Sequence, residues 1–160
     1  MTIANSADRS LTLNRGAGPV ALVLSIFDGL GRLPHWIIPL MARLAVAGVF
    51  WRSGMVKIAS WDQTVALFRD EYQVPVLPPE IAAYLGTTLE LACPVLLFFG
   101  FAARLGALGL LGMTFVIEVF VYPNNWPEHL TWATLLLIVL TRGAGPVSLD
   151  HLIRTRLFNR

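Results

Sequence analysis

Cysteine, histidine and charge are all scarce in this 160-residue chain. Its single cysteine, Cys93, excludes an internal disulfide and any zinc or iron–sulfur site built from several cysteines of this chain alone. The three histidines, His35, His129 and His151, are expected on different sides of a membrane and have no spacing typical of a zinc or iron motif, so we expect no metal site. Any redox chemistry would therefore need a cofactor or electrons from outside the chain.

Charged residues make up only 14% of the sequence, whereas apolar residues make up 56% and the mean hydropathy is +0.65. These values exceed those of an ordinary soluble domain and predict an integral membrane protein. The net charge of +2 and the pI of about 9.1 come mostly from the two ends of the chain. This distribution favours contact with anionic membrane lipid over binding to nucleic acid.

Four apolar segments predict an all-α fold, a bundle of four transmembrane helices. They cover residues 35–59, 80–100, 103–122 and 128–142. A span needs about 20 residues, so the fourth segment is rather short and no separate soluble domain fits in the chain. The second and third spans form an antiparallel hairpin, because only a short glycine-containing turn separates them.

Shorter segments flank these spans. Residues 1–18 predict a disordered tail, and residues 19–33 predict an interfacial helix because charges and glycines interrupt their apolar run. Apolar residues recur at helical spacing over residues 61–72, which predicts a short interfacial helix in the first outer loop. The chain thus divides into these two segments, a four-helix membrane domain over residues 34–146 and an interfacial tail over residues 147–160.

Basic residues gather before the first span, in the turn between the second and third spans, and after the last span. They are Arg9, Arg15, Arg32, Arg104, Arg142, Arg154, Arg156 and Arg160. The other two loops contain Arg69 as their only basic residue, together with several acidic residues. Because Lys and Arg accumulate on the cytoplasmic side of a membrane, this pattern predicts that both termini are cytoplasmic.

Five charged residues lie inside the predicted spans or at their edges. They are Arg43, Arg52, Lys57, Glu90 and Glu118. A charge in hydrocarbon costs about 2.5–3.5 kcal/mol on insertion scales, so each one needs a partner. At about 100° per residue, Arg43 and Lys57 share one face of their helix and Arg52 lies on the opposite face. Glu90 is the obvious carboxylate partner.

We therefore predict an intramembrane polar pocket formed by Arg43, Lys57 and Glu90. Pro94 cannot donate the hydrogen bond that the Glu90 carbonyl would normally accept, so this region offers a carboxylate and a free carbonyl. One interpretation is a ligand or proton site. The other is a structural ion pair, or a protonated glutamate, that fixes helix packing.

Glu118 and His129 fall toward the outer ends of the third and fourth spans and predict an outer-side proton or polar cluster, together with Lys57. His129 is suited to proton transfer because histidine titrates near neutral pH. The alternative is a polar anchor at the membrane boundary, beside the tryptophans of an aromatic belt. Small residues at four-residue spacing in the third span favour close packing within the bundle or within a homo-oligomer.

The order of several residues resembles the DoxX family of small bacterial membrane proteins. They are Arg43, Phe50, Gly54, Lys57, Glu90, Gly100 and Arg104, followed by the segment from Gly143 to Asp150 with its Gly-x-Gly…Ser-Leu-Asp pattern. The resemblance covers about residues 35–155. It implies a four-helix, multi-pass protein of the bacterial cytoplasmic (inner) membrane. Arg52 matches no family position.

The resemblance implies less about activity. The family takes its name from a similarity to the DoxD-type subunit of a thiosulfate:quinone oxidoreductase, some members look like partners of redox or thiol-stress proteins, and many have no assigned reaction. Residues 129–133 look like a branch of the family with histidine and tryptophan at the start of the fourth helix. We transfer no catalytic role to them.

Three functional hypotheses follow. The leading one is a membrane subunit of a quinone- or sulfur-linked redox system, at most an oxidoreductase subunit, in which Arg43, Lys57 and Glu90 face a quinone or an anionic substrate. No intrinsic cofactor is expected, so a quinone or a partner redox protein would supply the electrons. The alternative is a non-catalytic membrane anchor or assembly factor that recruits a soluble enzyme. A small transporter ranks last, because repeated halves and broken helices are not evident.

Overall fold

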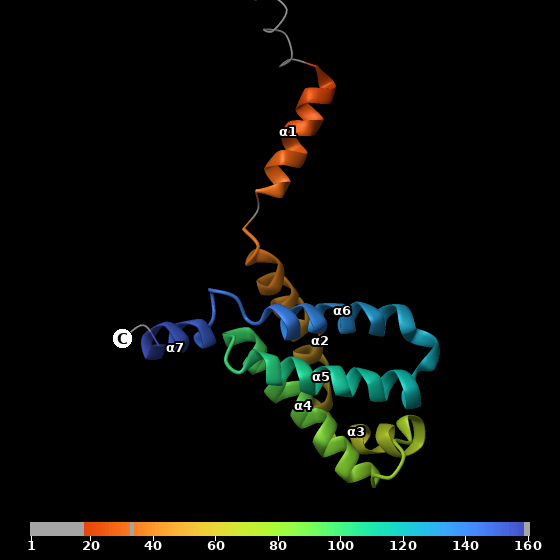
Figure 1. Ribbon diagram of the computed structural model, residues 1–160. Coiled ribbons are helices and arrows are strands. Elements are labelled where there is room, and N and C mark those ends of the chain that lie inside the picture. Colours follow the sequence, from red (N-terminus) through yellow and green to blue (C-terminus); the bar gives the residue numbers. More distant parts are fainter. Residues whose placement is uncertain (1–17, 33, 159–160) are drawn as a thin grey trace, which may run out of the picture. The chain divides into compact units, whose positions relative to one another are not determined.

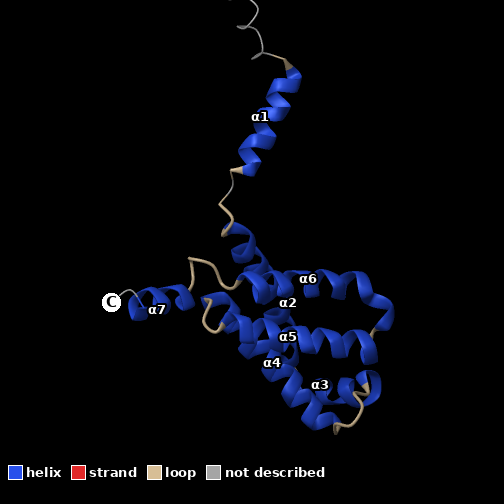
Figure 2. Ribbon diagram, viewed as in Figure 1, coloured by secondary structure: helices blue, strands red, loops and turns tan. Residues whose placement is uncertain are grey.

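The computed structural model describes residues 18–32 and 34–158 of the chain. Within these ranges the secondary structure consists of helices and contains no strand, which confirms the all-α fold class (Figure 1, Figure 2). The chain divides into two units, one ending at His35 and containing α1 (Pro19–Gly31), and a helical bundle from Trp36 onward. The tail predicted over residues 1–18 lies outside the described residues, except for Gly18.

The second unit is built around four long helices. They are α2 (Ile37–Ala59), α4 (Pro79–Phe99), α5 (Ala103–Val116) and α6 (Trp126–Arg142). α2 packs against α4 and α6, and α5 packs against the same two helices, so the four close into a bundle (Figure 1). Each helix contributes a fully buried aliphatic side chain to the core, namely Val46, Leu97, Leu110 and Leu136.

Three helices in the described part of the chain are long and apolar enough to cross a membrane. They are Ile37–Ala59, Pro79–Phe99 and Ala103–Val121, the last being α5 with the π-helical turn η2 (Ile117–Val121) that continues it. α6 has 17 residues, somewhat fewer than the roughly 20 that a span requires. The four-helix bundle is therefore observed, whereas the number of helices that cross the membrane stays a prediction.

Short helices lie between the long helices and after the last of them. α3 (Trp61–Leu67) and the π-helical turn η1 (Phe68–Tyr72) connect α2 to α4, η3 (Pro123–Asn125) precedes α6, and α7 (Leu149–Phe158) follows it. Phe68 packs against Ala82 and Ala83 of α4 and forms a second, smaller core. This core fixes η1 beside one end of the bundle.

Small residues allow close approach between neighbouring helices. A Cβ atom added at Gly54 of α2 would lie 2.7 Å from Leu91 Cδ2 of α4. Added Cβ atoms at Gly106 and Gly109 of α5 would lie 3.3 Å from the carbonyl oxygen and 3.2 Å from the Sγ atom of Cys93. Glycines at these contacts bring α2, α4 and α5 together and leave Cys93 buried between α4 and α5.

Candidate functional site

A buried ion pair joins α2 to α4 near one end of the bundle. Lys57 Nζ lies 2.9 Å from Glu90 Oε1, and the two side chains are only 9% and 3% exposed. Ser53 connects them further, because its Oγ atom accepts a hydrogen bond from Lys57 at 2.9 Å and donates one to Glu90 Oε1 at 3.1 Å. The second carboxylate oxygen, Glu90 Oε2, is buried and has no hydrogen-bond partner among the described residues. The site thus retains one vacant acceptor.

Local sequence explains this geometry. Ser53 and Lys57 are one helical turn apart, so both face the same neighbour, and Gly54 between them lets the Glu90 side chain come close at its Cβ atom. The Lys57 carbonyl accepts a hydrogen bond at 2.9 Å from Thr64 Oγ1 of α3. Glu90 therefore holds the ammonium group of Lys57, and Thr64 of α3 holds its backbone carbonyl.

A second polar pair joins η2 to α6. His129 Nδ1 lies 2.5 Å from Glu118 Oε2, and His129 is 3% exposed. The imidazole ring also packs against the Trp132 ring, with 5.1 Å between the ring centroids. Glu118 belongs to the π-helical turn η2, and such turns occur frequently at functional sites because they redirect side chains within a helix.

One cavity of about 690 Å³ connects the two polar pairs. Lys57, Glu90 and His129 line it, and its walls are mostly apolar, with the aromatic rings of Phe50, Tyr72 and Trp132 among them. A volume of this size lies within the range of about 300–1,000 Å³ that small-molecule sites occupy. Apolar and aromatic walls with a few converging polar groups are typical of a binding site for a ring-shaped, largely apolar molecule. We call it the amphipathic cavity.

Two tyrosines lie at the end of the amphipathic cavity that η1 and η2 form. The rings of Tyr72 and Tyr122 meet edge to face at 5.7 Å between centroids, and the Tyr122 hydroxyl donates a hydrogen bond to Glu71. Burial raises the pKa of Tyr72 above its usual value. The pKa of Tyr122 is also raised, mainly by burial and secondly by the hydrogen bond to Glu71. Both phenols therefore remain protonated donors at neutral pH.

Replacing Glu71 with glutamine is expected to lower the pKa of Tyr122 toward its ordinary value, because the negative charge that opposes the phenolate disappears. Folding raises the pKa of Tyr122 in the wild type. The contact therefore contributes stability below a pH of about 10, and this contribution is lost as the pH rises through the raised pKa. Ultraviolet titration of phenolate absorbance, in a Tyr84→Phe background, measures the change. An unchanged titration curve would show that Glu71 does not act on Tyr122.

The structure corrects the predicted grouping of Arg43 with Lys57 and Glu90. Arg43 lies about four helical turns, or roughly 21 Å, from Lys57 along α2. Its Nη2 atom donates a hydrogen bond to the Val147 carbonyl at 2.7 Å, and it is only 2% exposed. Arg43 therefore lies outside the amphipathic cavity, at the end of the bundle where the C-terminal segment packs.

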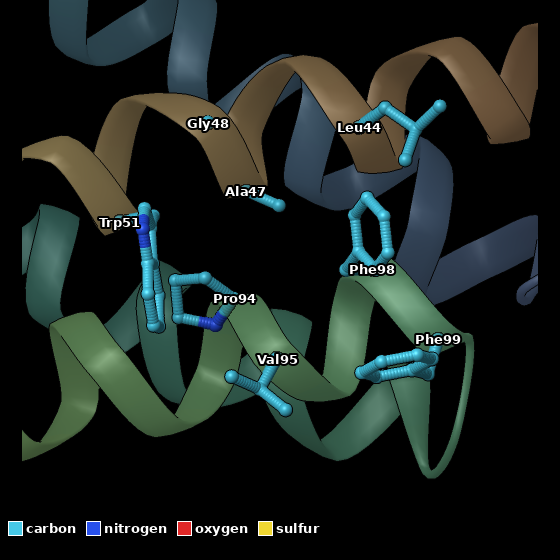
Figure 3. A pocket seen from close by; sticks show the side chains of 8 residues that line it. All are labelled: Leu44, Ala47, Gly48, Trp51, Pro94, Val95, Phe98 and Phe99. Carbon is cyan, nitrogen blue, oxygen red and sulfur yellow. The ribbon is translucent and has the colours of Figure 1, made fainter.

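Two further features lie apart from these pairs. Arg52 is exposed and forms no ion pair within residues 34–158, so the structure shows no partner for it. A groove of about 530 Å³ lies between α2 and α4, lined by side chains that include Trp51, Pro94 and Phe98 (Figure 3). No titratable side chain lines this groove, so it offers apolar contact without acid–base chemistry.

Sequence reasoning missed Ser53, Tyr72 and Tyr122. Ser53 carries a weak signal, because it precedes Lys57 by one helical turn in an otherwise apolar helix. Tyr72 and Tyr122 are brought together by the tertiary contact between η1 and η2, for which the sequence contains no local signal. The structure does bring together Lys57 with Glu90, and Glu118 with His129.

A helical membrane bundle with a partly polar cavity is the class of protein that this fold and site define. The family model described as DoxX matches residues 38–123, more than half of the chain, and the chain belongs to this family. It is also 32% identical over 130 residues to an uncharacterized protein of Haemophilus influenzae, which covers 72% of this chain and 82% of that protein. No solved structure matches the chain. The matched region ends before Gly143, so it excludes the C-terminal Gly-x-Gly…Ser-Leu-Asp pattern.

Proposed function

We propose that this chain is the membrane subunit of a redox system and that the amphipathic cavity binds a quinone. The observation that carries the proposal is the combination, in one cavity, of aromatic walls with a cation, a carboxylate with a vacant oxygen, and a histidine. A quinone ring matches this combination because its faces are apolar and its two opposite oxygens are polar. The family assignment supports a membrane location for this chemistry.

Each polar group has a role in this proposal. Lys57 Nζ would donate to an oxygen of a bound quinone and stabilise negative charge there, while Glu90 Oε2 would accept from the hydroxyl of the reduced ring. His129, hydrogen-bonded to Glu118, transfers protons to or from the cavity. A bound quinone supplies the redox chemistry, in which electrons and protons are taken up together. In this proposal the electrons come from a partner redox protein.

Quinone content is the direct test, and two glycine-to-leucine substitutions provide a matched pair. An added Cβ atom at Gly112 or at Gly48 would meet nothing within 4 Å. Gly112 lines the amphipathic cavity, whereas Gly48 lines the apolar groove of Figure 3. Gly112→Leu therefore fills the proposed site, and Gly48→Leu adds the same bulk elsewhere.

Each protein is purified in native-lipid particles, and an organic extract is analysed by mass spectrometry. We expect stoichiometric quinone from wild type and Gly48→Leu, and at least about tenfold less from Gly112→Leu, since about 1.4 kcal/mol of lost affinity gives a factor of ten. Lipid without quinone in all three would reject the redox proposal and favour the membrane anchor. The Lys57–Ser53–Glu90 contacts are the observation consistent with that alternative, because they could serve packing alone.

We also propose that the protein lies in the bacterial inner membrane with both termini in the cytoplasm. Arg104, Arg142 and Arg154 line one cavity at the end of the bundle near α7, whereas Glu71 of η1 and Glu128 in the first turn of α6 lie at the opposite end. This asymmetry agrees with the accumulation of basic residues on the cytoplasmic side. A reporter enzyme fused after Arg160 is expected to be active in the cytoplasm. Activity confined to the outside would invert the proposed topology.

A further inference from the structure

A second polar cavity, of about 420 Å³, is lined by one end of α5, the end of α6, the segment that follows α6 and the first residues of α7. Arg104, Arg142, His151 and Arg154 contribute its basic side chains, and Asp150 is the only acidic residue that lines it among the described residues. We call it the basic cavity. Neither the quinone proposal nor the family assignment accounts for it.

The Asp150 carboxylate already accepts hydrogen bonds from another part of the fold. Its Oδ1 and Oδ2 atoms accept hydrogen bonds from the backbone N–H groups of Ala102 and Ala103, at 2.8 and 3.1 Å, at the N-terminus of α5. Its own backbone N–H donates to the Gly100 carbonyl at 2.9 Å. A carboxylate at a helix N-terminus is stabilised by the free N–H groups and the helix dipole. Asp150 therefore holds the C-terminal segment in place, and its single carboxylate faces three arginines that line the cavity.

The guanidinium groups, by contrast, have no carboxylate partner. Arg104, Arg142 and Arg154 form no ion pair within residues 34–158. The Arg104 guanidinium lies close over Gly143, where an added Cβ atom would lie 3.6 Å from its Nε atom. Its Nη2 atom donates a long, 3.4 Å hydrogen bond to the Thr141 carbonyl at the C-terminus of α6. These contacts hold one guanidinium at the cavity wall while its remaining N–H donors stay available.

Arg43 adds a further positive charge behind the cavity. Gly100 separates it from Ser148, a residue of the cavity wall, since an added Cβ atom at Gly100 would lie 1.9 Å from Arg43 Nη1 and 2.5 Å from Ser148 Cβ. Arg43 Nε and Nη1 are buried and have no hydrogen-bond partner among the described residues. The positive potential of the basic cavity is therefore larger than its exposed side chains alone would produce.

The geometry points to a phosphate-binding site, occupied by the phosphodiester headgroup of an anionic phospholipid. Guanidinium groups match phosphate oxygens because their N–H donors form paired, charge-assisted hydrogen bonds. The cavity lies at an end of the apolar bundle, next to the apolar residues of α7, so acyl chains attached to the phosphate can remain in the membrane. This inference does not depend on quinone binding.

The test compares the removal of two cavity arginines, Arg104 and Arg154, with the removal of Arg156. Arg154 lines the basic cavity, whereas Arg156, on the same helix, does not. The protein in a neutral detergent is titrated with phosphatidylglycerol, and thermal unfolding and native mass spectrometry report binding. Phosphatidylcholine serves as the neutral lipid, and inorganic phosphate as the headgroup chemistry without acyl chains.

We expect Arg104→Gln/Arg154→Gln to weaken phosphatidylglycerol binding at least about tenfold and Arg156→Gln to leave it within about twofold, because only the first variant removes cavity donors. Selective stabilisation by phosphatidylglycerol identifies a lipid headgroup, whereas equal stabilisation by inorganic phosphate identifies a free phosphate as the ligand of the same site. Equal binding by the double variant and wild type, with unchanged circular dichroism, would overturn the inference. Quinone content measured in the same variants keeps this outcome separate from that of the proposed function.

Discussion

Replacing Gly100 with alanine is expected to destabilise the protein by about 3 kcal/mol or more, within the range caused by strain and overpacking together. Gly100 has a φ angle of +63°, in the left-handed region that costs a residue with a side chain roughly 1–2 kcal/mol. The added Cβ atom would also lie 1.9 Å from Arg43 Nη1 and 2.5 Å from Ser148 Cβ. Arg43 is buried, so it has no open space into which it can move.

Thermal unfolding in a mild detergent measures this effect, and Gly112→Ala is the matched control. Gly112 lies in α5, its φ angle is that of an ordinary helix, and an added methyl group would meet nothing within 4 Å. The control should change stability by less than about 1 kcal/mol and can stabilise the helix, because alanine favours helices over glycine. Equal unfolding temperatures for the two variants would show that Arg43 is not packed against Gly100 as described.

The same contact has a structural consequence for the C-terminal segment. The Gly100 carbonyl accepts a hydrogen bond from the Asp150 N–H group, and the Arg43 side chain donates one to the Val147 carbonyl. The Asp150 carboxylate in turn caps the N-terminus of α5. The packing around Gly100 therefore connects α2, the α4–α5 turn and the segment before α7. Loss of this packing should therefore release α7 and disrupt the basic cavity, whereas the amphipathic cavity lies at the opposite end of α2. Limited proteolysis would detect the release as new cleavage after Gly143.

The helices were predictable because their signals are local. Long apolar runs, bounded by prolines and glycines, placed α2 and α4 within about two residues of their observed ends, which is the uncertainty expected for helix boundaries. The turn between α4 and α5 was likewise indicated by Gly100. The π-helical turns η1 and η2 were not predicted, because the insertion of a residue into a helical turn leaves no periodic signal in apolar sequence.

The site was only partly predictable because a helical wheel gives the direction of a side chain but not its depth. Arg43 and Lys57 share a face of α2, and this led to one predicted pocket, although about four turns of helix separate them. The pairing of Lys57 with Glu90 could be predicted because an unpaired charge in an apolar environment costs free energy, so each charge needs a partner. Ser53, Tyr72 and Tyr122 are neutral, so their burial carries no comparable free-energy cost from which a partner could be predicted.

Replacing Lys57 with methionine is expected to destabilise the protein by about 3–5 kcal/mol, the range for removing one partner of a buried ion pair. Methionine matches the length of the lysine side chain, so packing changes little. The substitution leaves the Glu90 carboxylate 3% exposed, with Ser53 as its remaining hydrogen-bond donor among the described residues. Arg69→Met is the control, because the Arg69–Glu80 pair is more than half exposed and such pairs contribute about 0–1 kcal/mol.

The double variant Lys57→Met/Glu90→Leu distinguishes a structural role of the pair from a functional one. Removing both partners of a buried pair is often neutral for stability, so the double variant should recover most of the stability that Lys57→Met loses. Thermal unfolding of the single and double variants in one detergent completes the cycle. If the pair binds the ligand, we expect the folded double variant to contain at least about tenfold less quinone than wild type, because both polar contacts to the ring are removed. A stable double variant with full quinone content would instead restrict Lys57 and Glu90 to helix packing and place the ligand contacts elsewhere in the cavity.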